Sequence, residues 1–156
     1  MKRLLCVLLI LFLVPACVTG ETIDSVLMDF NVAAKICGAP ELGSEYNRTS
    51  KATFDMLEFV VSSEIITGFT EKGGEISGGY VVCLDSAKEG EFLALCATHF
   101  LTFCGYDQMQ KAYANILDMF LETRQGKETT EVVVGNMMIE MFAMKTGLAF
   151  NYSIVK

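Results

Sequence analysis

The first twenty residues place the strongest constraint on how this chain folds, because they predict where folding takes place. Lys2 and Arg3 precede an unbroken apolar run over residues 4–14, and small residues follow up to Gly20. This three-part pattern is typical of a secretory signal peptide, and its apolar part is short for a membrane span. We therefore expect cleavage after Gly20 and a secreted, extracellular chain of residues 21–156 that folds under oxidising conditions.

The mature chain is acidic. Removal of the leader, which carries Lys2 and Arg3, leaves 136 of the 156 residues and changes the net charge from −7 to −9. A chain with no basic stripe is a poor candidate for binding nucleic acid or anionic membranes. A second apolar stretch, residues 132–150, contains Asn136, Glu140 and Lys145, which disfavour stable membrane insertion. The length fits one domain.

Helical spacing of apolar residues dominates the mature chain. Steps of three and four predict a compact all-α bundle of about five helices. The expected helices cover residues 21–38, 51–66, 91–104, 107–126 and 129–147. A β-branched run leaves a strand open as an alternative within 51–66. Paired glycines at 73–74 and 78–79 indicate a loop or a short β-hairpin near residues 70–84.

Four cysteines remain after cleavage, and an even number in an exported chain predicts two disulfides. They are Cys37, Cys83, Cys96 and Cys104. Two residues eight apart on one helix are about 12 Å apart, too far to bridge, so Cys96 and Cys104 would each pair with Cys37 or Cys83. Both arrangements stay open. A zinc site that uses Cys96 and His99 is disfavoured by the oxidising route, so we expect no metal and His99 packed at a helix surface.

Two N-glycosylation sequons are present, Asn47-Arg48-Thr49 and Asn151-Tyr152-Ser153. The first lies in a polar stretch that is expected to be a loop, which makes its modification plausible. Asn47 and Asn151 are therefore the predicted glycosylation sites of a secreted glycoprotein.

No catalytic motif is recognisable. His99 is the single histidine, no Gly-x-Ser-x-Gly elbow exists, and the glycine pairs lack the spacing of a phosphate-binding loop. Glu140 lies among methionines, either as the solvated edge of a helix or as a partly buried acid that faces a ligand cavity. We expect no enzyme and no cofactor.

The apolar residues carry the one functional clue. The chain is rich in Met and Phe and has no Trp, which suits an adaptable apolar cavity as well as ordinary core filling. We hypothesise a binding protein for a small hydrophobic ligand, or alternatively a protein–protein interaction module such as an effector, a venom component or a receptor ligand. The candidate ligand-lining residues are Phe54, Leu57, Val61, Phe100, Phe103, Tyr113, Met138, Met141 and Phe142.

An acidic, exported helical chain with cysteines on its helices resembles the insect odorant-binding proteins in architecture. The resemblance implies a carrier role by analogy. It does not extend to the cysteine pattern, because this chain keeps four cysteines and continues for 52 residues after Cys104.

Overall fold

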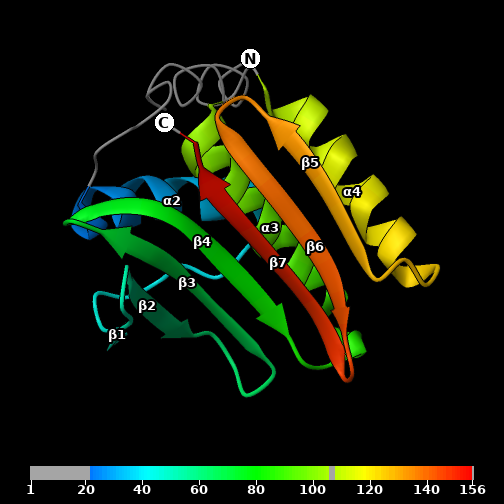
Figure 1. Ribbon diagram of the computed structural model, residues 1–156, viewed down its shortest axis with the longest axis horizontal. Coiled ribbons are helices and arrows are strands. Elements are labelled where there is room, and N and C mark those ends of the chain that lie inside the picture. Colours follow the sequence, from blue (N-terminus) through cyan, green and yellow to red (C-terminus); the bar gives the residue numbers. More distant parts are fainter. Residues whose placement is uncertain (1–21, 106–107, 156) are drawn as a thin grey trace, which may run out of the picture.

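The computed structural model describes residues 22–105 and 108–155 and consists of one antiparallel sheet with helices on one of its faces (Figure 1). The sheet has seven strands in the order β1-β2-β3-β4-β7-β6-β5. The helices are α2 (Ile23–Cys37), α3 (Glu89–Cys104) and α4 (Met109–Arg124), with the short 3-10 helix η1 (Ser86–Lys88) before α3. The strands are β1 (Asn47–Ser50), β2 (Asp55–Val60), β3 (Ile65–Lys72), β4 (Glu75–Cys83), β5 (Thr129–Val134), β6 (Met137–Met144) and β7 (Gly147–Ile154).

Two three-stranded meanders make up most of the sheet. The strands β2, β3 and β4 follow α2, the strands β5, β6 and β7 follow α4, and the meanders meet where β4 pairs with β7. Two-residue turns close the hairpins β3–β4 and β5–β6. Gly73 and Gly74 in the first turn both have positive φ, 65° and 87°, as a type I′ turn requires. Local turn chemistry therefore helps to align the strands of these two hairpins.

The core lies between the helices and one face of the sheet. Along each strand, alternate side chains point toward the helices, so β7 buries Leu148, Phe150 and Tyr152 while its intervening residues face away. Helix α3 is the central helix and contacts both α2 and α4 (Figure 1). An ion pair between Arg124 and Glu89 joins the end of α4 to the start of α3.

The prediction of an all-α bundle was wrong. Helices are present at three of the five expected places, as α2, α3 and α4, but residues 51–66 and 129–147 fold as strands. In β6 the buried residues Met137, Ile139 and Met141 alternate with half-buried ones, which is a period of two and not of 3.6. The hairpin expected near 70–84 is present but longer, because β3 begins at Ile65.

The two predicted disulfides are also absent, because Cys37, Cys83, Cys96 and Cys104 form no disulfide in the described part of the chain. Cys83 lies near Cys96, but the second pair of that scheme, Cys37 and Cys104, lies against different elements. The Cys104 thiol lies 3.0 Å from the Met137 sulfur under β6, whereas Cys37 contacts the Thr98 side chain. Burial raises the pKa of Cys96 well above its usual value, so this thiol is a protonated, apolar core group.

Among the described helices, none combines the length and apolar character needed to cross a bilayer.

Candidate functional site

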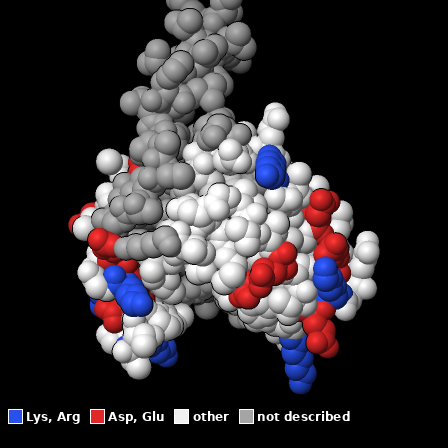
Figure 2. All heavy atoms as spheres, turned by 45° about the horizontal axis from the view of Figure 1, so that its top comes forward, with Lys and Arg blue, Asp and Glu red and all other residues white. Residues whose placement is uncertain are grey.

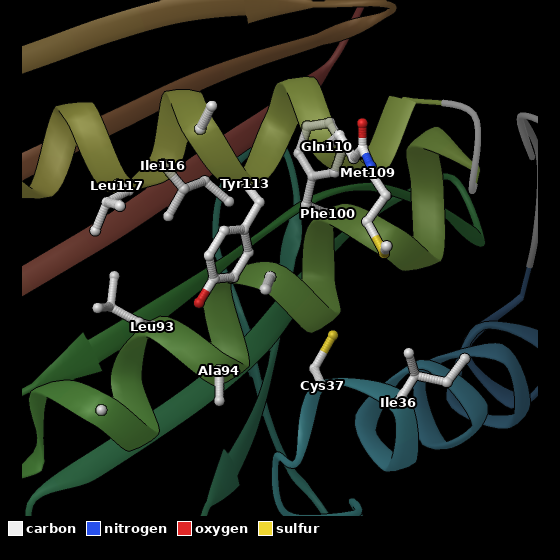
Figure 3. Close-up of a pocket in the computed structure, with 13 residues that line it drawn as sticks. Ile36, Cys37, Leu93, Ala94, Phe100, Met109, Gln110, Tyr113, Ile116 and Leu117 are labelled. Carbon is white, nitrogen blue, oxygen red and sulfur yellow. The ribbon is translucent and has the colours of Figure 1, made fainter.

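An apolar pocket of about 810 Å³ lies among the three helices. Its floor is α3, its upper wall is the first half of α4, and its end is the last turn of α2 (Figure 3). The lining residues are Ile36, Cys37, Gly90, Leu93, Ala94, Ala97, Phe100, Met109, Gln110, Tyr113, Ala114, Ile116 and Leu117. The volume is within the range of ~300–1,000 Å³ that is usual for small-molecule sites.

Small residues on α3 create this space. Gly90, Ala94 and Ala97 recur at three- and four-residue steps, so they share one helix face and leave the space between α2 and α4 unfilled. Figure 3 shows the Tyr113 ring extending from α4 toward Leu93, with the Cys37 thiol across the pocket at the end of α2. Tyr113 is 53% exposed and Leu117 is 40% exposed, so a large part of each of these two side chains at the pocket is in contact with water.

The pocket offers few polar groups. The side chains of Gln110 and Tyr113 bring polar atoms, and none of the lining residues is charged. Burial raises the pKa of the Cys37 thiol, while its hydrogen bond with Thr98 acts in the opposite direction. A neutral thiol, an amide and a phenol suit recognition of an uncharged or weakly polar apolar molecule.

The His99 side chain points from α3 toward the sheet, where it is part of a buried hydrogen-bond chain, and it does not lie at a helix surface as predicted. Its Nε2 is 2.6 Å from the Thr67 hydroxyl, and its Nδ1 is 3.1 Å from the Tyr152 hydroxyl. Because the Thr67 hydroxyl donates to the Tyr80 carbonyl, Nε2–H donates to Thr67 and Nδ1 accepts from Tyr152. Desolvation lowers the pKa of His99 to about 3, so the ring is neutral near pH 7.

The hydrogen-bond chain through His99 has a structural role. It ties α3 to β3 and to β7, at the junction of the two meanders, and His99 is 0% exposed. Both ring nitrogens are occupied by hydroxyl partners, so neither is free for a metal ion or a substrate. Among the described residues, no group of three or more His, Cys, Asp or Glu side chains is placed to hold a metal ion.

The sheet face that points away from the helices has a second hollow, of about 650 Å³. Across this open face, one row of opposed residues runs through all seven strands: Asn47, Glu58, Gly68, Tyr80, Asn151, Glu140 and Glu131. The neighbouring row is mainly apolar and contains Val60, Ile66, Val82, Ala149 and Phe142. Glu140 therefore lies half-exposed on the open face, and not on a helix.

The Tyr80 ring lies across Gly68 on this face, where a Cβ would be 2.7 Å from Tyr80 Cζ. The Tyr80 hydroxyl is buried, and no described residue forms a hydrogen bond with it. Burial and, second, the neighbouring Glu58 carboxylate raise the pKa of Tyr80 to about 12. Tyr80 is therefore an uncharged aromatic floor for the hollow.

The predicted ligand-lining residues do not form one site. Phe100 and Tyr113 line the helical pocket, whereas Leu57, Phe103 and Met141 are core residues with 0%, 2% and 0% exposure. Phe54, Met138 and Phe142 belong to strands or turns on the open side, and Val61 packs at the edge of the core. Most of the lining residues from α3 and α2, including Ala94, Ala97 and Cys37, were not among the predicted ligand-lining residues.

Charged groups do not gather around one site on the surface that is visible in Figure 2. Acidic and basic side chains lie in small groups at its left and right, with an acidic patch right of the centre, and uncharged surface lies between these groups. Comparisons with protein-family models, with curated proteins and with solved structures find no match.

Proposed function

We propose that this chain is an exported, non-enzymatic binding protein that takes up a small apolar ligand between α2, α3 and α4. The observation that carries the proposal is the uncharged pocket of about 810 Å³ beside the exposed side chains of Tyr113 and Leu117. A ligand there would remove these apolar surfaces from water, at ~25 cal/mol for each Å² buried. The fold is a helix-covered antiparallel sheet and not the all-helical bundle of the carriers that the sequence resembles.

A substitution that fills the pocket tests the proposal directly. Ala94→Phe adds a ring on the pocket face of α3, and Ala87→Phe makes the same change at an exposed residue of η1 that does not line the pocket. We expect Ala94→Phe to weaken binding of the fluorescent hydrophobe N-phenyl-1-naphthylamine roughly tenfold or more, which corresponds to ~1.4 kcal/mol. Ala87→Phe should bind the probe like the unmodified protein.

The measurement is a fluorescence titration at matched protein concentration, with urea unfolding as the check that both variants are folded. Native mass spectrometry of protein purified without delipidation should also show a bound hydrophobe that is lost in Ala94→Phe. Equal probe binding by the two variants would rule out the pocket as the site.

A second candidate function is docking of another protein on α4. Tyr113, Leu117 and Leu121 recur at four-residue steps, and Leu121 is 47% exposed although it does not line the pocket. Leu121→Lys distinguishes the two functions. Loss of binding to a protein partner with probe binding unchanged would favour docking on this stripe, whereas loss of the probe only in Ala94→Phe favours the small ligand.

A further inference from the structure

We propose that N-linked glycans on Asn151 and Asn47 cover the open face of the sheet, leaving the helical layer as the binding side of the molecule. The proposal shares with the proposed function only the expectation of export. The two sequon asparagines, 104 positions apart in the chain, occupy the same row of the same sheet face.

The strand geometry of the second sequon suits modification. In β7, Asn151 and Ser153 point to the open face, while Tyr152 between them points inward to His99. Asn151 is half-buried, and Asn47 is exposed on the edge strand β1. The side chain that would carry the glycan and the hydroxyl of the sequon are thus on the outside, and a glycan on Asn151 leaves the buried Tyr152 contact in place.

The surroundings of Asn151 suit the sugar nearest the protein. Asn151 and Ser153 line the hollow of about 650 Å³, together with Ile66, Tyr80 and Val82. Pyranose rings have one largely apolar face, which packs against aliphatic and aromatic side chains, and hydroxyl groups around the rim. The hollow has an apolar side in Ile66 and Val82, and the buried Tyr80 hydroxyl lacks a described partner.

A covering glycan also accounts for the surface chemistry of this face. Val60 and Val133, on opposite halves of the sheet, are each 63% exposed, and Phe142 is half-buried with no helix above it. A sheet face with exposed apolar residues promotes association unless something covers it. N-linked glycans are bulky and hydrophilic, and one on a central strand with a second on β1 would block close docking there.

The rate of methionine oxidation measures whether a glycan covers the open face. Met138 is paired with Ser153 across β6 and β7, so it is a diagonal neighbour of Asn151 at a distance on the order of 7 Å. Met28 lies on α2 and is 68% exposed, far from this row in the fold, so it serves as the internal control. Exposed methionine is oxidised by hydrogen peroxide to the sulfoxide, with transfer of one oxygen atom and release of water.

The experiment uses the full chain secreted from a eukaryotic cell line. Peptide mapping after treatment with peptide N-glycosidase F should find Asn151 and Asn47 converted to Asp. Ser153→Ala should abolish the modification of Asn151 and increase the rate of Met138 oxidation, on the order of threefold or more, with Met28 unchanged. Ser153→Thr keeps the sequon and should behave like the unmodified protein.

Enzymatic removal of the glycan from the folded protein should increase Met138 oxidation to the same degree, so the result does not depend on how the variant folds. Unmodified Asn151 in the secreted protein would overturn the proposal. An unchanged rate of Met138 oxidation after glycan removal would also overturn it. This holds too if sedimentation shows a dimer, in which a second copy of the chain protects this face. Probe binding in the helical pocket is measured separately and tests only the proposed function.

Discussion

Gly147→Ala should destabilise the protein by at least ~3 kcal/mol, because the backbone of another strand occupies the place of the missing side chain. Gly147 begins β7 beside the end of β4. A Cβ built there would overlap the Cys83 carbonyl oxygen and lie 3.0 Å from Leu84 Cα. Backbone atoms in a paired strand cannot rotate away, so the junction between the two meanders would have to open.

Gly90→Ala is the matched control, since the same atom is added to open space. No heavy atom of the described residues lies within 4 Å of a Cβ built at Gly90, which is exposed in the first turn of α3. Alanine favours a helix over glycine by ~1 kcal/mol, so this variant should gain up to that amount. Urea unfolding of both variants measures the two changes, and comparable stability of Gly147→Ala and the unmodified protein would contradict the close approach in the structure.

The helices could be predicted because their apolar residues recur at helical spacing and a recognisable residue ends each helix. In α2 the buried residues Val26, Phe30 and Ala33 follow helical spacing, and Gly38 ends the helix with a φ of 70°. The strands were misread because apolar residues occur on both faces of the sheet. Met138 and Phe142 on the open face fill the gaps between Met137, Ile139 and Met141, so the segment imitates a broad helical face.

Turn chemistry could have corrected this interpretation. Gly135-Asn136 separates two apolar runs by two residues, and Gly135 has a φ of 61°, which is the signature of a tight hairpin. Gly73-Gly74 gives the same signal between β3 and β4. A helix over 129–147 requires Gly135 in its interior, at a cost of ~1 kcal/mol relative to alanine.

The candidate site was harder to predict because small residues form it. Ala94 and Ala97 contribute space and not contact area, and a search for large apolar residues overlooks them. The long-range placement of Asn47 and Asn151 on one row depends on the pairings β1–β2 and β4–β7, which local sequence patterns do not determine. Both sequons were visible, but their common face was not.

His99 should make the protein sensitive to mild acid. Its folded pKa of about 3 is below the ordinary value near 6.5, so the unfolded chain binds a proton that the folded chain excludes. The stability that depends on the neutral ring is therefore fully present above about pH 6.5 and is lost as the pH falls toward 3. Between pH 7 and pH 5 this single group should remove about 2 kcal/mol of unfolding free energy.

His99→Gln separates this effect from the carboxyl groups, because it removes the only histidine while it keeps a side chain able to donate and accept hydrogen bonds. The variant should be ~1–3 kcal/mol less stable at pH 7, since Gln does not reproduce the geometry to Thr67 and Tyr152. Its loss of stability from pH 7 to pH 5 should be about 2 kcal/mol smaller than that of the unmodified protein. Urea unfolding at pH 7, 6 and 5 provides the comparison. Parallel pH profiles would show that His99 is not held neutral, because a histidine that protonates equally in the folded and unfolded chains contributes nothing to the difference.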